Sequence, residues 1–548
     1  MKKNVSLLLA ALLVCTCALT ACGKPSAKLD AAGKYSLSES GEAILNDEAL
    51  LTGFQAEDNS RVFYEIFTGS FSDSDGDGTG DLRGIINRMD YLNDGDPDSG
   101  LSLGVEGLWL TPIFRSPSYH KYDVTDYYTV DSAFGTQEDL AELIALCHQR
   151  NVKLILDLPI NHTGTNCQWF VSFKNAHRNG DTADPYYDFY SYYTAGVDST
   201  PTGTFAQISG TDDFYECNFS GDMPELNFDS DAVRQAVLDV AKYYLDMGVD
   251  GFRFDAAKYI YFGDNARSLE FWTWYLRELR AIKPDIYTVA EVWDGDGITD
   301  VYYAATDCFD FSVSQNGLIA ETARGGSASR YASYVEKYVK RVNSIRSGSM
   351  FLPFITNHDM DRAAGFLSPD SGQMQVAANL YLLSPGSPFI YYGEELGMKG
   401  SRGGASTDAN RRLAMVWGDG DTVKNPSGST YGQSSQIQNG AVEQKGDSDS
   451  LYSYYKRLIM IRKANPEIAR GEIKTVTVPN SKLGGFTATL DGSAVCVLHN
   501  TTTAPLTVDL SAVTDLPLQE IRAVIGMGNA TLDGTTLTLD GQTSIVLR

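Results

Sequence analysis

Strand-like and helix-like segments alternate over roughly 400 residues of this chain. Short apolar runs such as RVFYEIF (61–67), VKLILDL (152–158) and IYTVAEV (286–292) take turns with amphipathic stretches such as TQEDLAELIALCHQRN (136–151). This alternation predicts an α/β protein with a parallel sheet, and its length suits a closed (β/α)8 TIM barrel.

The alternation is interrupted once and stops well before the C-terminus. Residues 163–228 are rich in Tyr, Asp and Gly and are too long for an ordinary loop, so we expect a small domain inserted after the third strand. Residues 467–548 contain short Thr-, Val- and Leu-rich runs separated by Gly, Asn and Asp, which predict a C-terminal antiparallel β-sandwich. The barrel is therefore expected over 61–162 and 229–466.

The N-terminus is typical of an export signal. Lys2 and Lys3 precede a short apolar run, which predicts a signal peptide over residues 1–21. The run ends in Leu19-Thr20-Ala21-Cys22, which resembles a bacterial lipobox. The resemblance implies a lipid on Cys22, a tether over 22–60 and an extracellular protein anchored to the cell membrane. The alternative is a plain signal peptide with an incidental cysteine.

The net charge limits the possible binding partners, and the number of cysteines limits the possible disulfides. The net charge of −26 argues against nucleic acid or an anionic membrane surface, so contact with the membrane is expected only through the lipid anchor. Five cysteines follow Cys22, an odd number that excludes a fully paired disulfide framework. Cys167 and Cys217 share the inserted segment and either pair or remain buried free thiols.

Polar residues follow four of the apolar runs at the end where each predicted strand finishes. Active sites of such barrels lie at this end of the strands. Several unpaired carboxylates buried close together cost free energy, so their presence there indicates a catalytic role. Any one of them alone would more often be a strand cap, but four groups at the same edge predict an active site. The residues are Asp157, Asn161 and His162; Arg253 and Asp255; Glu291; and Asn357, His358 and Asp359.

The stretch DSDGDGTGD (73–81) alternates carboxylates with small residues, a pattern suited to wrapping a hard cation. An EF-hand loop would need Glu at its twelfth position, where this chain has Gly84. A fixed metal clip and a solvated acidic turn both remain compatible with these residues.

Several segments together resemble the α-amylase superfamily of glycoside hydrolases. DLPINH, GFRFDAAKY, EVW and FITNHD match its four defining regions in order and spacing, and the similarity covers about 61–548. MPELN (223–227) and GEELGM match further regions, and the MP-LN form is similar to members between oligo-glucosidases and neopullulanases. The resemblance implies an α-glucan substrate and retaining hydrolysis.

The resemblance assigns a role to each carboxyl group. Asp255 would attack the anomeric carbon, while Glu291 would first protonate the leaving oxygen and then activate water. Retention places two such carboxyls about 5–5.5 Å apart. Asp359 would hold the sugar hydroxyls and favour the distorted ring. Arg253 would keep Asp255 ionised by charge pairing, and nearby carboxylates would keep Glu291 protonated.

Substrate-binding residues follow from the same matches. His162 and His358 would donate hydrogen bonds to the sugar, Tyr122 would stack on its ring, and Asp123 would support Tyr122. Lys258 would contact a leaving-group sugar. The family often has His after this lysine, whereas this chain has Tyr259.

Many relatives bind calcium in an acidic loop after the first barrel strand. The resemblance therefore implies a fixed calcium clip formed by Asp73, Asp75, Asp77, Asp81 and the carbonyl of Thr79. A second calcium at Asn161 and Glu225 is a further alternative: Asn161 is present, but Glu225 replaces the aspartate usual there.

The leading expectation is endo-acting hydrolysis of α-1,4-glucosidic bonds in starch, glycogen or maltooligosaccharides. Neopullulanase, α-glucosidase and 4-α-glucanotransferase activities are alternatives, since loop shape selects the acceptor. A non-catalytic glucan-binding protein is a further alternative, although all three catalytic carboxyls are present.

Overall fold

The computed structural model describes residues 50, 52–368, 371–405, 407–432 and 437–548. The expected signal peptide (1–21), the lipidation site Cys22 and nearly all of the tether before residue 50 lie outside the described residues. Within the described part, no helix is long and apolar enough to cross a bilayer.

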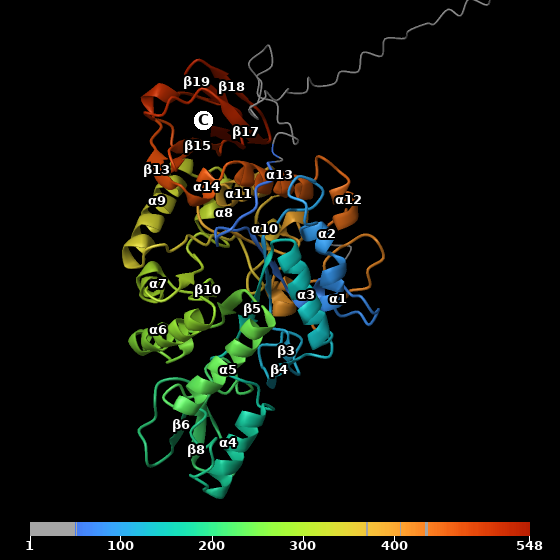
Figure 1. Ribbon diagram of the computed structural model, residues 1–548, viewed down its shortest axis with the longest axis vertical. Coiled ribbons are helices and arrows are strands. Elements are labelled where there is room, and N and C mark those ends of the chain that lie inside the picture. The colour runs from blue at the N-terminus through green and yellow to red at the C-terminus, as the bar shows by residue number, and fades with distance from the viewer. Residues whose placement is uncertain (1–49, 51, 369–370, 406, 433–436) are drawn as a thin grey trace, which may run out of the picture.

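The centre of the molecule is a parallel sheet of seven strands in the order β11-β10-β9-β5-β2-β1-β12 (Figure 1). Residues 351–355 fill the gap between the two edge strands: Phe389 N donates to Pro353 O (3.0 Å), and Asp310 N donates to Leu352 O (3.3 Å). The expected (β/α)8 barrel is therefore confirmed, with this segment as its seventh strand in chain order. The strands are β1 (Phe63–Ile66), β2 (Gly107–Leu110), β5 (Lys153–Leu158), β9 (Gly251–Phe254), β10 (Tyr287–Ala290), β11 (Asp307–Cys308) and β12 (Phe389–Tyr391).

Helices surround this barrel because each buries one apolar face against it. In α5 (Asp231–Met247), the buried residues Val233, Val237, Val240 and Tyr244 recur at three- and four-residue intervals, and the helix ends at Gly248 in a left-handed conformation. The other helices are α1 (Leu82–Asn87), α2 (Met89–Leu92), α3 (Gln137–Gln149), α6 (Asn265–Ile282), α7 (Asp296–Tyr303), α8 (Leu318–Ala323), α9 (Ala328–Ile345), α10 (Ala363–Phe366), α11 (Gln373–Leu382), α12 (Ala441–Lys445), α13 (Leu451–Ala464) and α14 (Glu467–Arg470).

The barrel interior is packed with aromatic and aliphatic side chains from alternate strand positions. Phe63, Trp109, Ile155, Tyr287 and Phe389 belong to one buried cluster, and Phe63 stacks on Phe389 with ring centroids 4.9 Å apart. The barrel is therefore a solid support, and any site must lie at an end of the strands.

An inserted domain follows β5, as expected. It contains α4 (Gln168–Asn179) and a three-stranded antiparallel sheet of β6 (Tyr192–Thr194), β8 (Asp213–Glu216) and β7 (Phe205–Gln207), in that order. A hairpin of β3 (Phe114–Arg115) and β4 (Asp126–Val130) lies between this domain and the barrel (Figure 1). Cys167 and Cys217 are both buried free thiols, so the alternative of a disulfide between them is not realised.

The C-terminal part is an antiparallel β domain, as expected. One sheet has the order β13-β14-β15-β20-β17 and the other β16-β19-β18, and Cys496, Leu498, Leu537 and Ile545 belong to a shared apolar core. The strands are β13 (Glu472–Val476), β14 (Leu483–Leu490), β15 (Ser493–Asn500), β16 (Leu506–Asp509), β17 (Ile521–Gly526), β18 (Ala530–Asp533), β19 (Thr536–Leu539) and β20 (Thr543–Leu547).

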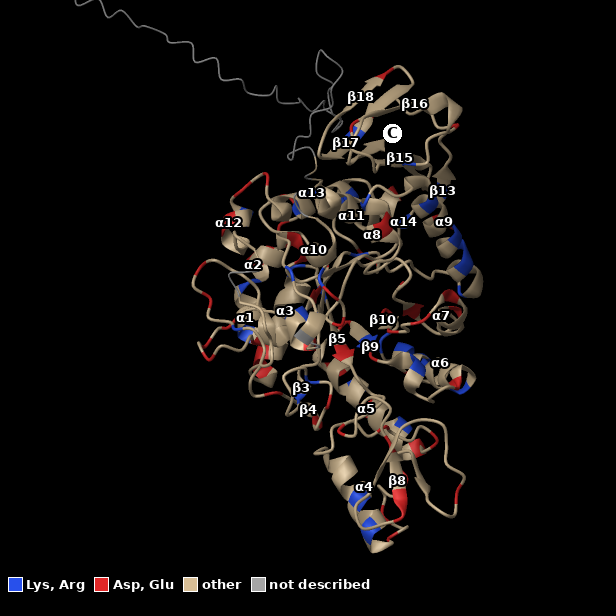
Figure 2. Cartoon of the chain, turned by 180° about the vertical axis from the view of Figure 1, so that it is seen from behind, with Lys and Arg blue, Asp and Glu red and all other residues tan. Residues whose placement is uncertain are grey.

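Charge is spread over many elements. In Figure 2, acidic side chains are scattered over the barrel loops and the inserted domain, while Lys and Arg are prominent along α9.

Candidate active site

The polar groups at the four strand ends meet around one cavity of about 500 Å³ at the C-terminal edge of the barrel. Asp255 follows β9, Glu291 follows β10, and Asp359 follows the 351–355 strand. All three line this cavity. Because the barrel strands are parallel, their carboxyl ends share one rim, and residues far apart in the sequence come together there.

Arg253 links the carboxyl groups at the base of the cavity. Its Nη1 donates to Asp157 (2.7 and 2.9 Å) and to Asp255 Oδ1 (2.8 Å), and its Nη2 contacts Glu291 Oε2. Arg253 and Asp157 are fully buried and lie side by side in register on β9 and β5. One guanidinium therefore holds Asp255 and Glu291 next to each other, which the expected pairing of these two residues requires.

The protonation states differ in the way that general acid catalysis requires. Burial raises the pKa of Asp255 to about 6 and that of Glu291 to about 7, and the positive charge of Arg253 opposes both shifts. The expected effect of neighbouring carboxylates on Glu291 is present, since Asp255 and Asp359 also raise its pKa, but burial is the larger cause. At pH between these values, Asp255 is mostly ionised and Glu291 mostly protonated.

Asp359 is held as a carboxylate by two cationic partners. Its Oδ1 accepts from Arg412 Nη2 (2.6 Å), and its Oδ2 lies 3.0 Å from His358 Nε2. Although burial opposes ionisation, these charges lower the pKa of Asp359 well below its usual range. Asp359 can therefore accept hydrogen bonds from sugar hydroxyls across the cavity.

The side chain of His358 lies behind the cavity wall, whereas the sequence predicts that it contacts the sugar. It is fully buried and is not among the residues that line the cavity. Its Nδ1 is 2.6 Å from Glu65 Oε1, and its Nε2 also lies 2.7 Å from the Tyr122 hydroxyl. Burial disfavours the imidazolium, but Asp359 and Glu65 outweigh it and raise the pKa of His358 to about 10. His358 therefore positions Asp359 and Tyr122 from behind the wall.

The remaining expected residues lie in or behind the wall. Tyr122 lines the cavity and donates to Asp157 Oδ2 (2.8 Å), while Asp123 lies behind it and accepts from Ser116 Oγ (2.7 Å). His162 lines the cavity, and burial lowers its pKa to about 4, so it is neutral. Lys258 donates to Asp294 (3.0 Å) at the rim.

Sequence reasoning missed several residues that the structure places here. Glu65 left a detectable signal, a carboxylate inside the apolar run of β1. Arg412 and the aromatic rim of Phe219, Tyr259 and Trp293 come from irregular segments without strand periodicity. Phe219 packs 4.7 Å from Tyr259, and the side chains of Phe219 and Trp293 are 45% and 43% exposed, so the rim has apolar surface available for a sugar ring.

The acidic loop gathers three carboxylates instead of the expected four. Oxygen atoms of Asp73, Asp75 and Asp81 lie within 4.8 Å of one another, a spacing that fits calcium–oxygen bonds of about 2.3–2.6 Å. Asp77 lies outside this group and accepts the Thr79 N–H (2.6 Å). The loop is also fixed from outside, because Thr422 Oγ1 donates to Asp73 (2.6 Å).

At the alternative second calcium position, Glu225 is hydrogen-bonded by a neighbouring residue. Glu225 accepts hydrogen bonds from the backbone N–H and side-chain amide of Asn218 (2.9 and 3.0 Å). Burial, with the nearby Glu216, raises the pKa of Glu225 to about 8, so it carries a proton at neutral pH. The second calcium at Asn161 and Glu225 stays a prediction, because a bound cation would itself favour the ionised form of Glu225.

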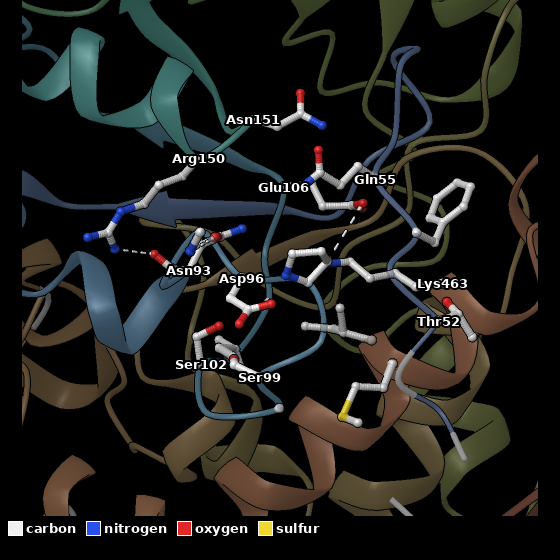
Figure 3. Close-up of a pocket in the computed structure, with 18 of the residues that line it drawn as sticks. Thr52, Gln55, Asn93, Asp96, Ser99, Ser102, Glu106, Arg150, Asn151 and Lys463 are labelled. Atoms are coloured by element: carbon white, nitrogen blue, oxygen red, sulfur yellow. Dashed lines mark hydrogen bonds and ion pairs between the residues drawn. The ribbon is translucent and has the colours of Figure 1, made fainter. Parts of the chain in front are cut away.

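A smaller pocket lies at the opposite end of the barrel (Figure 3). It has a volume of about 50 Å³, and its wall contains Glu106, directly before β2, and Asn151, two residues before β5. Lys463 Nζ lies 3.9 Å from Glu106 Oε1. Its position at the N-terminal ends of the strands separates it from the carboxyl groups described above.

Comparison with known proteins agrees with this geometry. The family described as "Alpha amylase, catalytic domain" matches residues 65–471. "Alpha-amylase 3" of Dictyoglomus thermophilum is 34% identical over 445 residues, covering 80% of this chain and 84% of that protein. The "4-alpha-glucanotransferase" of Thermotoga neapolitana is 29% identical over 456 residues, covering 80% and 95%. Other relatives are named oligo-1,6-glucosidase and cyclomaltodextrinase.

A solved structure shows the same architecture. "Eubacterium rectale Amy13B" superposes with a TM-score of 0.83 at 33% identity, covering 91% of this chain and 97% of that one. The match extends over the barrel, the inserted domain and the C-terminal β domain, since it leaves only a small part of the chain uncovered. The chain therefore belongs to the α-amylase family of glycoside hydrolases, family 13.

Proposed function

We propose that this protein hydrolyses internal α-1,4-glucosidic bonds in starch, glycogen or maltooligosaccharides with retention of configuration. The observation that carries the proposal is Arg253, which holds Asp255 and Glu291 side by side at the base of an open cavity, with Asp359 in the same wall. Two adjacent carboxyls of different pKa are the chemical requirement for a retaining glycosidase.

The proposed reaction has two steps. Asp255 Oδ attacks the anomeric carbon while the proton on Glu291 passes to the departing glycosidic oxygen, so the carbon–oxygen bond breaks as the glycosyl ester forms. Glu291, now a carboxylate, takes a proton from water, whose oxygen displaces Asp255. Asp359 binds sugar hydroxyls, and its negative charge stabilises the oxocarbenium-like ring in both steps.

Calcium is proposed as a structural ion held by Asp73, Asp75 and Asp81. When bound, it would neutralise three neighbouring carboxylates and stabilise the loop after β1. The spacing of the three carboxylates supports this proposal.

The N-terminal sequence supports an exported protein anchored at the cell membrane. The Lys2-Lys3 start, the apolar run and Cys22 in the lipobox-like context carry this part of the proposal. Intact-mass measurement of the membrane fraction, with Cys22→Ala as the control, tests it: the wild-type protein should carry a lipid and the variant should be released.

Glucan transfer is a second candidate activity. The aromatic rim of Phe219, Tyr259 and Trp293 supports it, since a second sugar stacked there would compete with water for the glycosyl ester. The relative named 4-alpha-glucanotransferase agrees with this candidate.

Product analysis separates these activities. A maltoheptaose blocked at its non-reducing end should yield shorter oligosaccharides, because an endo-acting enzyme does not need that end. Release of no product would favour an exo-acting glucosidase, and products longer than the substrate would show transfer. Asp255→Asn should abolish cleavage while preserving the melting temperature; unchanged activity would overturn the assignment.

A further inference from the structure

Glu65 is a buried carboxyl group that lies behind the catalytic cavity. It is the third residue of β1, it is only 1% exposed, and it does not line the cavity. The backbone N–H of His358 (3.3 Å) and the ring Nδ1 of His358 (2.6 Å) both contact Glu65 Oε1. Burying a carboxylate costs free energy unless a partner compensates its charge, and the His358 ring is that partner.

Both ring nitrogens of His358 face oxygen atoms. While Nδ1 faces Glu65, Nε2 lies 3.0 Å from Asp359 Oδ2 and 2.7 Å from the Tyr122 hydroxyl oxygen. The Tyr122 hydroxyl donates its proton to Asp157 Oδ2 (2.8 Å), so its oxygen accepts a hydrogen bond from Nε2. Asp359 is a carboxylate and accepts as well. Nε2 of His358 therefore carries a proton.

The charge of the ring depends on a second proton, which lies between Nδ1 and Glu65. The 2.6 Å contact requires a proton there, because two lone pairs at that distance repel each other. Burial raises the pKa of Glu65, and the positive charges of His358 and Arg253 oppose that shift. Burial disfavours the imidazolium too, but carboxylates at both ends of the ring raise the pKa of His358 to about 10. The second proton is therefore on Nδ1, and the ring is positively charged.

This positive charge acts on the catalytic carboxyls. Burial raises the pKa of Asp255 and Glu291, and the positive charges of Arg253 and His358 oppose both shifts. Loss of the charge on His358 would therefore raise the pKa of both carboxyls further. The titratable and charged groups around the Glu65–His358 pair are His120 and Tyr122 from the β3–β4 loop, Asp157 from β5, Arg253 and Asp255 at the end of β9, Glu291 after β10, Asp359, Tyr391 from β12, and Arg412.

We propose that Glu65 is a positioning residue that keeps His358 doubly protonated, so that the ring holds Asp359 and Tyr122 in place and supplies a constant positive charge behind the catalytic carboxyls. The state of the ring rests on the contacts of Glu65 and His358 alone. Its effect on the pH profile of the enzyme rests on the proposed function.

Glu65→Gln tests the proposal because it keeps the size of the side chain and removes its charge. The amide can donate to an unprotonated Nδ1, so the His358 ring should keep its Nε2 proton and its place but become neutral. Glu395→Gln is the matched control. Glu395 is also fully buried and lies beside β1, but its Oε1 accepts from Tyr64 (2.7 Å) and Tyr91 (2.6 Å), and it does not line the cavity.

The first measurement is NMR of the full-length protein with isotope-labelled histidine, in which the His358 signals are identified by their loss in His358→Gln. It is made about two pH units above the ordinary histidine pKa of about 6.5, where an unperturbed imidazole is neutral. Both ring nitrogens of His358 should carry a proton in the wild type and in Glu395→Gln. Only Nε2 should carry one in Glu65→Gln.

The second measurement is the pH profile of kcat/KM on maltotetraose. A carboxyl that loses a neighbouring positive charge ionises at higher pH, so both limbs of Glu65→Gln should move to higher pH by about half a unit. The variant also lacks the negative charge of Glu65, but that charge lies beyond the ring, on its Nδ1 side. Glu395→Gln should keep both limbs at their wild-type positions, and melting temperatures show whether each variant folds.

Each other outcome overturns the proposal. A wild-type His358 ring with only one proton would show that Glu65 itself holds the second, and this spectrum decides the point even if Glu65→Gln does not fold. Two ring protons in Glu65→Gln, unmoved limbs, or equal shifts in Glu395→Gln would show that Glu65 does not set the charge. Failure of the proposed function is distinguishable, because the wild-type enzyme would then cleave no glucan while the NMR result still stands.

Discussion

The pH dependence of kcat/KM tests the assignment of Asp255 and Glu291 directly. The nucleophile must be ionised, so activity should fall as pH drops through its pKa of about 6. The acid must be protonated, so activity should fall as pH rises through its pKa of about 7. The profile should therefore be a narrow bell centred between these two values.

The magnitude follows from the same two pKa values. At pH 8.5, which is about 1.5 units above the Glu291 pKa, only about one enzyme molecule in thirty retains the proton on Glu291. The acid side is symmetrical: about 1.5 units below the Asp255 pKa, about one molecule in thirty has an ionised nucleophile. Burial is the main cause of both shifts, so salt should move the limbs little.

Glu291→Gln with α-maltosyl fluoride isolates the two limbs. Fluoride leaves without protonation, so the first step no longer needs the acid, and the amide does not titrate. The alkaline limb should disappear from the rate of fluoride release in the first turnover, while the acid limb of Asp255 remains. An alkaline limb that persists in this variant would assign it to another group and refute the reasoning.

Three further predictions concern the surrounding groups. Arg412→Gln should lower kcat/KM about a hundredfold, because Asp359 loses its 2.6 Å ion pair with Arg412 and is no longer held in position. A stopped assay on maltotetraose measures this loss, and wild-type activity in the variant would contradict it. Tyr122→Phe should lower the free energy of unfolding by about 1.5–3 kcal/mol in urea titrations, because the buried Asp157 loses a hydrogen bond; an unchanged midpoint would count against that bond. Chelation should lower the melting temperature of wild type and Asp77→Asn but not of Asp75→Asn, because only Asp75 belongs to the three-carboxylate group; equal responses of the two variants would argue against this ligand set.

The barrel and the catalytic carboxyls could be predicted because one physical rule covers both. Parallel strands that alternate with helices must all end at the same rim of the barrel. The position of a polar residue directly after an apolar run can therefore be predicted from the sequence alone, without knowing its contacts. Asp255 and Glu291 illustrate this, since they lie 36 positions apart in the sequence and still contact one guanidinium. The C-terminal domain was predictable from its short Thr-, Val- and Leu-rich runs, which are separated by Gly, Asn and Asp and have no amphipathic helical stretches between them.

Residues outside the strands do not obey that rule, so the sequence does not determine where their side chains lie. His358 directly precedes Asp359, and a two-residue motif does not show that one side chain enters the cavity while the other turns back to Glu65. In the acidic loop, Asp75 and Asp77 have the same residue type and the same spacing from glycine, and each accepts the N–H two residues on (3.1 and 2.6 Å). Only Asp75 also has an oxygen close to those of Asp73 and Asp81. Turn geometry, which composition does not determine, separates these pairs.

Sequence motifs predicted one of the two cavities and not the other. The catalytic cavity was found because family regions mark its residues. A second cavity of about 730 Å³ lies between the β3–β4 hairpin and α4, and Arg115, Tyr128 and Trp169 in its lining belong to none of the quoted motifs. These residues come from a hairpin and an inserted helix whose separation depends on how the inserted domain packs on the barrel. That packing is held by buried contacts such as the hydrogen bond from the Tyr127 hydroxyl to the His162 carbonyl oxygen.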